Sequence, residues 1–426
     1  MGNIEDSAQP VATESVWQRP GFAAYIGTTA FSGMALAMQQ LLYSWLLIGV
    51  LLLPADQVGL LQALVGVPGI LLMLMGGASA DLRDPREMLI WIYLLAPVLP
   101  LSLILAQQSG WLGVASVTAW GVGMGIVQSY SMPGQQAILN RISGPAIQAG
   151  VTTATAIGFI VQVIGLMLAG QMDVIGVAPV LFFQAATLVL AGLVMFRIPA
   201  VPHSTPASAA ANFGIARRMR RTSQDIVAGI AATRQHVVIW QVLWVNFVSS
   251  IFNAGSFLTV FPFIVKRVFM GDAWTLALLM AVFFAGAAVS NFILLRYMPL
   301  RTPGRLFLLM QLSRIVVLYL MWIEPDFWLM LVATIGWGLN MGVTTNLARA
   351  IVQESAPAEF RGRILSVFAV GMVGSAPIGA ILLGYLVETI GTLNALMPAM
   401  LVSLGLFLYG YLRSAIWDYQ SPVAQT

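Results

Sequence analysis

The sequence contains no cysteine, only two histidines and few charged residues, and each shortage excludes a class of function. Without cysteine there are no disulfides and no thiolate metal ligands. His203 and His236 lie in or beside one polar stretch, so we expect no histidine metal cluster and no cofactor. Charged residues make up 8% of the 426 positions, whereas a soluble domain carries about 25%. We therefore expect lipid to be the main solvent of this chain.

Apolar residues, by contrast, make up 59% of the chain and form long runs. A membrane-spanning helix needs ~20 such residues, and backbone polar groups in lipid must be satisfied within their own segment. The sequence therefore predicts an all-α membrane protein. Glycine, proline and charged residues divide it into twelve expected transmembrane helices, at 21–50, 56–80, 87–107, 111–139, 146–170, 174–197, 236–265, 273–298, 303–323, 327–353, 362–387 and 392–413.

Basic residues predict the orientation of these helices, because they concentrate on the cytoplasmic side of membrane proteins. Sixteen of them fall in loops and ends on the side of the N-terminus, whereas Lys266 and Arg267 fall on the other side. Both termini are therefore expected to be cytoplasmic.

The stretch 199–235 interrupts the regular series of spans with prolines, an Ala/Ser-rich segment and the basic run Arg217–Arg221. We expect a cytoplasmic linker with a surface helix, whose arginines contact anionic lipid headgroups; a regulatory or partner-binding role is the alternative. The net charge of +4 is spread over many loops and does not indicate nucleic-acid binding. The expected organisation is an N-terminal tail, a six-helix bundle, the linker, a second bundle and a C-terminal tail, at 1–19, 20–198, 199–235, 236–415 and 416–426.

Two short patterns occur once in each expected bundle. Trp120–Gly125 matches Trp337–Gly342, and Gly165–Gly170 matches Gly379–Gly384. Parallel repeats of six helices place a binding site at their interface, near the middle of the bilayer. The sequence therefore predicts two six-helix bundles related by pseudo-two-fold symmetry.

Three motifs resemble those of the major facilitator superfamily, particularly its enterobactin-exporter-like and macrolide-efflux-like branch. Gly77–Arg86 is similar to the signature Gly-x-x-x-Asp-Arg-x-Gly-Arg-Arg/Lys, with departures at Leu82 and Pro85. Pro357–Arg363 resembles the element Pro-x-Glu-x-Arg-Gly-Arg, and Met132–Leu139 resembles Asn-Pro-Ala-Arg-Gln-Ala-Leu-Leu. The resemblance covers nearly the whole chain and implies a secondary transporter in the cytoplasmic membrane of a bacterium.

The resemblance also implies a latch between the two bundles on the cytoplasmic side. Asp81, at a helix end, can accept hydrogen bonds from the exposed amides where the eleventh helix starts, and favourable charge at a helix end is worth ~0.3–1 kcal/mol. We expect this latch to hold the outward-facing state; a helix cap without a gating role is the alternative. The candidate latch residues are Gly77, Asp81, Arg83, Arg86, Glu359, Arg361 and Arg363.

No carboxylate lies in the middle of an expected span, which argues against proton-coupled antiport. Interior polarity comes instead from amides and hydroxyls at helical spacing. These polar faces fall on the first, fourth, seventh and tenth helices, which line the central cavity in the superfamily. The alternative is that they join helices through hydrogen bonds worth ~0.6 kcal/mol each. The candidate cavity residues are Gln39, Tyr43, Gln128, Gln135, Asn246, Asn253, Phe257, Trp337, Asn340 and Arg349.

Two arginines, Arg349 and Arg314, fall inside expected spans. Arg349 is close to the cytoplasmic end of its helix, where it can snorkel to the surface, pair with Glu354 or face the cavity. Arg314 lies near the middle of the ninth helix, which is peripheral in the superfamily, so backbone carbonyls or a solute must satisfy it. Arg349, more than Arg314, is a candidate to attract an anionic solute.

These patterns favour a secondary active transporter that exports a small, partly apolar or anionic organic solute, siderophore-like or drug-like, by alternating access. An importer or facilitator without proton coupling is the alternative within transport. A non-transporting enzyme or receptor has less support, since no reactive side chain lies in the middle of a span. The expected partners are the solute and the bilayer, and the chain is expected to be a monomer.

Overall fold

The computed structural model describes residues 15–79, 84–200, 229–231, 233–357 and 359–422, which form helices and turns and contain no strand. The main helices of the first part are α1 (Phe22–Trp45), α2 (Ala55–Ser79), α3 (Pro85–Leu95), α4 (Val98–Gln108), α5 (Val114–Ser143), α6 (Ile147–Ala169), α7 (Met172–Ile175) and α8 (Val177–Met195). Those of the second part are α10 (Val237–Gly255), α11 (Phe261–Phe263), α12 (Ala273–Tyr297), α13 (Pro303–Trp322), α14 (Phe327–Ser355), α15 (Arg361–Ile390) and α16 (Met397–Arg413).

Ten helical stretches within the described ranges are long and apolar enough to cross a membrane. Two further long helices, α2 with 25 residues and α5 with 30, lie where the sequence predicts the second and fourth spans. The expectation of an all-helical, multi-pass membrane protein is confirmed.

Several helices begin at an aspartate that binds their first free amides. Asp84 accepts a hydrogen bond from the N–H of Arg86, Asp272 from that of Thr275 and Asp326 from that of Leu329. The first N–H groups of a helix have no partner within the helix, so a short acidic side chain stabilises its start. Burial raises the pKa of the Asp272 carboxyl, but the hydroxyl and the amide of Thr275 more than offset this and hold the pKa below its usual value.

Three of the expected spans are irregular, and the first of these ends in a π-helical turn, Leu46–Val50. The third is divided into α3 and α4 at Ala96–Pro97, because proline has no N–H to donate within a helix. The seventh runs from Val237 to Val268 and contains two π-helical turns, Ser256–Val260 and Ile264–Val268, on either side of α11. Such turns add one residue to the helical repeat and mark bends.

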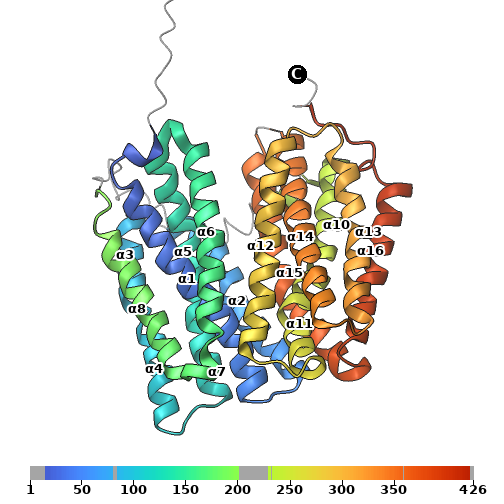
Figure 1. Ribbon diagram of the computed structural model, residues 1–426. Helices are drawn as coiled ribbons and strands as arrows, with labels where there is room; N and C mark the ends of the chain where they lie inside the picture. The colour runs from blue at the N-terminus through green and yellow to red at the C-terminus, as the bar shows by residue number, and fades with distance from the viewer. Residues whose placement is uncertain (1–14, 80–83, 201–228, 232, 358, 423–426) are drawn as a thin grey trace, which may run out of the picture.

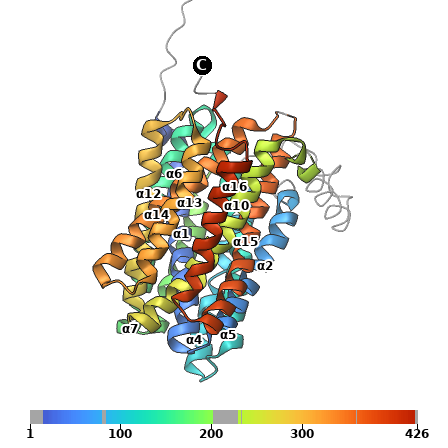
Figure 2. The ribbon, with the colours of Figure 1, turned by 90° about the vertical axis from the view of Figure 1, so that its right-hand side faces the viewer.

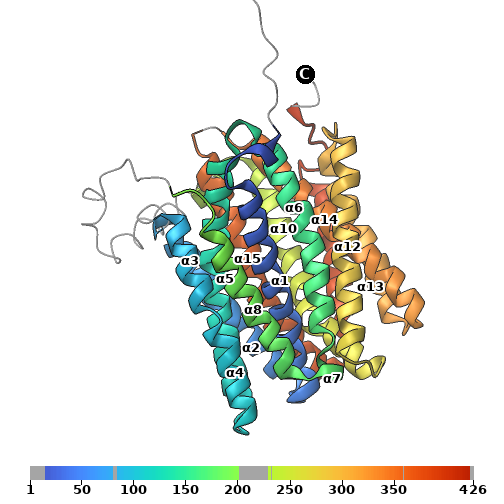
Figure 3. The ribbon, with the colours of Figure 1, turned by 60° about the vertical axis from the view of Figure 1, so that its left-hand side comes forward.

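The helices gather into two groups, which we call the N-terminal half (α1–α8) and the C-terminal half (α10–α16) (Figure 1). Figure 2 brings the C-terminal half to the front, and Figure 3 shows the N-terminal half from its outer side. In the N-terminal half α1 packs on α6 and α8, α2 on α5, and α3 on α5 and α8. In the C-terminal half α10 packs on α15 and α16, α12 on α14, and α13 on α14 and α16. Taken in chain order, these are the same pairs of spans in both halves, as an internal repeat requires.

The halves meet through α2 against α15 and α6 against α12. We call the side where α1 begins and α16 ends the terminus side, at the top of Figure 1, and the other the opposite side. The closest approaches lie toward the opposite side: an added Cβ at Gly59 would overlap the carbonyl oxygen of Ala380, and one at Gly384 would overlap that of Ala55. An added Cβ at Gly170 would lie 2.5 Å from the Cβ of Ala277. Glycine thus allows the two halves to touch backbone to backbone on this side.

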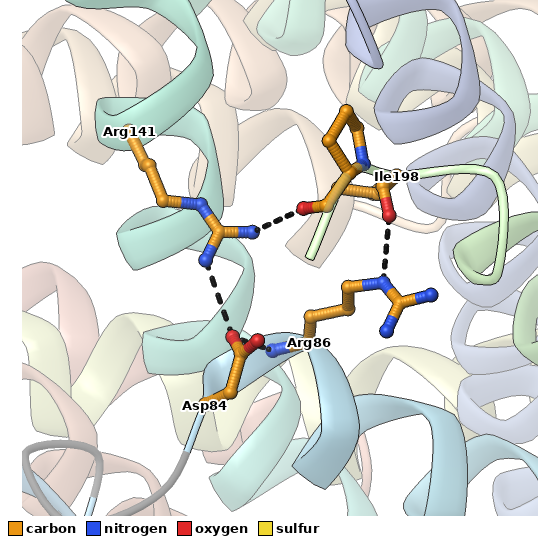
Figure 4. A network of polar contacts seen from close by, with 5 residues as sticks. Asp84, Arg86, Arg141 and Ile198 are labelled. Atoms are coloured by element: carbon orange, nitrogen blue, oxygen red, sulfur yellow. Dashed lines mark hydrogen bonds and ion pairs between the residues drawn. The ribbon is translucent and has the colours of Figure 1, made fainter. Parts of the chain in front are cut away.

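On the terminus side, arginines tie the ends of helices within each half. In the N-terminal half, Arg86 donates from Nε to the carbonyl oxygen of Ile198 at 2.7 Å and from Nη2 to that of Phe196 at 3.0 Å. Arg141 at the end of α5 pairs with Asp84 at 3.2 Å and donates to the carbonyl oxygen of Pro199 at 3.4 Å (Figure 4). The start of α3 and the ends of α5 and α8 are therefore held as one unit.

The C-terminal half has an equivalent clamp at the start of α13. Arg305 donates from Nε to the carbonyl oxygen of Trp417 at 3.2 Å, and its guanidinium lies 5.6 Å from the centre of a Trp417 ring. Arg86 and Arg305 thus occupy corresponding places, each binding the backbone that follows the last helix of its own half.

The glycines of α15 provide a test of this packing. A Cβ at Gly379 would overlap the backbone of α10 at Ile251, whereas one at Gly374 would meet nothing within 4 Å. We expect Gly379→Ala to lower the free energy of unfolding by about 1–3 kcal/mol through overpacking. Gly374→Ala should be neutral or stabilising by up to ~1 kcal/mol, because alanine favours helix. Thermal unfolding in detergent, followed by tryptophan fluorescence, distinguishes them; equal midpoints would contradict the packing.

The terminus-side clamp gives a second test. Arg86→Gln removes the two charged hydrogen bonds to the end of α8. At this partly exposed position we expect the free energy of unfolding to fall by about 1–2 kcal/mol. Arg413→Gln, at an exposed position at the end of α16, should change stability by less than about 0.5 kcal/mol. The same unfolding measurement applies, and a variant at Arg86 as stable as that at Arg413 would show that the clamp carries no stability.

Candidate functional site

A cavity of about 330 Å³ lies where the N-terminal half faces α12 of the C-terminal half. Its walls come from α1, α5 and α6, with one residue of α12 on the far side. All the side chains that line it are uncharged, and they include Thr29, Ser32, Gln135, Thr155, Gln162 and Phe284. The cavity offers hydroxyls, amides and two phenyl rings to a solute, but no ion pair.

Two glutamines fix the polar part of this cavity. Gln135 of α5 donates from Nε2 to the hydroxyl of Ser32 at 2.9 Å and to that of Tyr93 at 2.6 Å. Gln162 of α6 donates from Nε2 to the Oε1 of Gln40 at 3.1 Å. These bonds join α1, α3, α5 and α6, so the amide groups are held in position before any solute arrives.

The cavity lies near the middle of the membrane. Thr29 is seven residues into α1 and Gln162 fifteen residues into α6, and both helices begin on the terminus side. At a rise of 1.5 Å per residue, the lining lies about 10–22 Å from that side, in a hydrocarbon layer about 30 Å thick. This is the depth at which transporters with parallel repeats hold their solutes.

The other candidates of the N-terminal half are placed outside the cavity lining. Gln39 is buried and lies 3.4 Å from the amide of Gln184 on α8. The hydroxyl of Tyr43 donates to the carbonyl oxygen of Leu61 on α2 at 3.0 Å. Gln128 is exposed. Of this group, the structure brings Gln135 into the cavity.

Ser249 of α10 and Asn340 of α14 contact a buried arginine and do not line this cavity. Arg314 of α13 is 3% exposed and donates to the hydroxyl of Ser249, to Oε1 of Gln311 at 3.4 Å and to Oδ1 of Asn340 at 3.3 Å. Asn340 in turn donates to the carbonyl oxygen of Met310 at 2.6 Å and to Ser313 at 2.7 Å. Among the described residues none of these partners is acidic, so hydroxyl and amide dipoles stabilise the guanidinium.

The remaining candidates of the C-terminal half pack within that half. The indole of Trp337 donates to Oδ1 of Asn253 at 2.7 Å, and Phe257 lies 5.8 Å from Trp337 between ring centres. Phe283 and Phe261 complete this aromatic cluster. Asn246 lies 3.3 Å from the sulfur of Met372. Phe284, which stacks edge-on against Phe257 at 5.8 Å, connects the aromatic cluster to the cavity.

Asn340 also borders a second cavity, of about 590 Å³, between α12, α13 and α14. Its walls are almost entirely apolar and include the exposed side chains of Tyr297 and Val316. Because it lies on the outer face of the C-terminal half and does not touch the N-terminal half, we regard the first cavity as the candidate solute site.

The predicted latch residues divide between described and undescribed parts of the chain. Asp81 and Arg83 lie outside the described residues, and of Gly77 only its place in α2 is described. Arg86 binds within its own half, and Arg361 donates to the carbonyl oxygen of Ala356, also in its own half, at 3.4 Å. Glu359, like Arg349 of the cavity set, is exposed. Arg363 lies at the start of α15.

The sequence analysis missed the contribution of α6 to the cavity. Thr155, Gly158 and Gln162 recur at intervals of three and four residues, which places them on one face of that helix. Thr29 and Ser32 show the same spacing on α1. Helical periodicity of small and polar residues was therefore the signal that could have found them.

Comparisons with known proteins agree with this architecture. The sequence family described as Major Facilitator Superfamily matches residues 22–376. No curated protein matches the sequence.

Solved structures share the fold at low sequence identity. A nucleoside transporter, NupG, is 13% identical with a TM-score of 0.72, covering 93% of this chain and 99% of its own. A peptide transporter, POT, in complex with sulfate is 14% identical with a TM-score of 0.67, covering 95% and 96%. A bacterial homologue of the human lysosomal transporter Spinster, in an inward-facing and unoccupied conformation, is 13% identical with a TM-score of 0.61, covering 93% and 95%. With a family match over most of its length and the helix arrangement of these transporters, the chain belongs to the Major Facilitator Superfamily.

Proposed function

We propose that the protein is a secondary transporter that moves a small organic solute across the membrane by alternating access of its two halves. The observation that carries this proposal is the uncharged cavity at mid-membrane depth, walled by one half and faced by Phe284 of the other. When the two halves rock about a site that they share, the site opens first to one side of the membrane and then to the other.

The solute that this cavity fits is partly apolar and neutral. Its hydroxyls and amides suit hydrogen-bonding groups, and Phe159 and Phe284 offer apolar contact. Of the two anionic-solute candidates, Arg314 is sealed among polar partners and Arg349 does not line the cavity. The neutral form of the expected siderophore-like or drug-like solute is therefore favoured over the anionic form.

We further propose that the chain crosses the membrane twelve times. In this series α3 and α4 together form one span, and α2 and α5 complete the set. The distribution of basic residues supports cytoplasmic termini, and the motif resemblance supports export from the cytoplasmic membrane of a bacterium by a monomer. Import or facilitated diffusion remains the alternative direction, because the same cavity can be loaded from either side.

Proton coupling through a mid-membrane carboxylate has no support in the described structure. Each described acidic residue lies in a loop or near the end of a helix, as Asp56, Asp173 and Glu388 do. The cytoplasmic latch between Asp81 and the start of α15 remains part of the proposal for the state in which the terminus side closes.

A substitution that fills the cavity tests the site. Gly158 lines the cavity, and an added Cβ there would meet nothing within 4 Å, so Gly158→Leu can fold while occupying the space of the solute. We expect a rise in KM or a fall in transport of about tenfold or more, since an apolar side chain in place of solute removes most of the binding contacts. The measurement is flux into proteoliposomes of a matched panel of neutral, anionic and cationic siderophores, macrolides and lipophilic compounds.

The control is Gly405→Leu, which also meets nothing within 4 Å but lies on the exposed face of α16. It should transport as the parent protein does. Equal flux by both variants would place the solute elsewhere, and preference for an anionic member of the panel would overturn the neutral class. Each panel member is measured with and without a pH gradient, because accumulation driven by that gradient would contradict the absence of proton coupling.

A further inference from the structure

Two carboxylates on the opposite side bind helix starts that belong to the other half. Asp173 of α7, in the N-terminal half, accepts a hydrogen bond through Oδ2 from the N–H of Ala273, the first residue of α12, at 2.8 Å. Glu388 of α15, in the C-terminal half, accepts one through Oε1 from the N–H of Ala55, the first residue of α2, at 2.7 Å. Each bond joins one half to the other.

These bonds match the physical character of a helix start. The first N–H groups of a helix are free, and the aligned peptide dipoles place positive potential there. A carboxylate brought from another helix satisfies both at once. The start of α2 is thus bound by Glu388 of the other half, and the start of α12 by Asp173 of the other half together with its own Asp272. In α3 and α14 the cap is the residue just before the helix.

The two bonds are related by the internal repeat. Asp173 follows the fifth span and Glu388 ends the eleventh, which are the corresponding spans that carry the matched Gly165–Gly170 and Gly379–Gly384. Ala273 and Ala55 begin the eighth and second spans, which also correspond. The pseudo-two-fold axis that relates the halves therefore also relates the two bonds, so one rocking motion of the halves makes or breaks both.

Each carboxylate is oriented by a second partner at the end of the first span of its own half. The indole of Trp45 donates to Oδ1 of Asp173 at 3.2 Å, and Arg267 pairs with Glu388 at 2.7 Å. The ammonium of Lys266 lies 5.1 Å from the centre of a Trp45 ring, which adds a contact across the halves. Lys266 and Arg267 are the two basic residues that the sequence analysis placed apart from all others.

The carboxylates are positioned for a contact that must be reversible. Glu388 keeps 32% of its side chain exposed, and Asp173 is exposed as well. Water screens such bonds and can replace them when the halves separate. The glycine contacts at Gly59, Gly384 and Gly170 lie next to the caps, so the bonds close the edge of a packed interface.

We propose that Asp173 and Glu388 are the gate residues of the opposite side, and that they hold this side closed while the cavity exchanges solute on the terminus side. This inference rests on the proposed transport by alternating access. They are positioning residues that act on the equilibrium between two states and do not touch the solute.

The absence of native cysteine makes a direct test possible. Spin labels on cysteines at Trp111 and Trp328, both exposed on the opposite side, report that side by electron–electron distance measurement in the full-length protein. A second pair at Asn140 and Gln353, exposed near the ends of α5 and α14, reports the terminus side. The parent protein gives the reference distributions.

Asp173→Ala and Glu388→Ala are compared, singly and together, with the control Asp326→Ala, which removes a cap made within one half on the same side. Each gate variant should raise the ratio of opposite-side-open to opposite-side-closed molecules by about two- to fivefold, the value of a charge at a helix end. The first label pair should then lengthen and the second shorten. Asp326→Ala should leave both distributions unchanged.

Asp173→Asn and Glu388→Gln retain side-chain volume, so they provide the same test if an alanine variant does not fold. Unchanged distances in folded gate variants, or an equal shift in Asp326→Ala, would overturn the gate. Shifted distances together with no flux of any panel solute in the parent protein would support the gate and overturn the proposed transport. Flux in the parent with unchanged distances in the variants would leave transport standing and reject the gate.

Discussion

Contact between the two halves depends on the absence of side chains where α2 crosses α15. At Gly59 and Gly384 the backbones come so near that any added Cβ would overlap a carbonyl oxygen of the other helix. A contact of this kind has one geometry, because dense packing leaves no room for sliding. It therefore fixes where α2 and α15 meet on the opposite side.

Each half is itself held together by hydrogen bonds between its helices. In the N-terminal half, Arg86 and Arg141 hold the ends of three helices together on the terminus side, and Gln135 and Gln162 join four helices deeper in the membrane. In the C-terminal half the hydrogen bonds of Arg314 and the clamp of Arg305 have the same effect. Between the halves the described hydrogen bonds are few and partly buried, so we expect motion to be concentrated there.

The sequence predicted the helices well, because a run of about 20 apolar residues in lipid has few alternatives to a helix. Of the expected cavity residues of the N-terminal half, Gln135 lies in the wall of the first cavity. The sequence could not indicate which neighbour a polar face would meet: Ser249 and Asn340 show the periodicity of a cavity lining, yet they are engaged by Arg314 from another helix. The carboxylates of the other half that bind the starts of α2 and α12 were equally hidden, since they lie 333 and 100 positions away in the chain. Local pattern identifies a polar face, whereas tertiary packing chooses its partner.

Arg314 has one further consequence, which concerns the electrostatic potential inside the protein. Arginine retains its proton in proteins, and the described residues around it contribute dipoles but no opposite charge. At an effective dielectric constant of about 20, a unit charge changes the energy of another unit charge ~15 Å away by ~1 kcal/mol. The buried guanidinium of Arg314 therefore makes the electrostatic potential inside the C-terminal half positive.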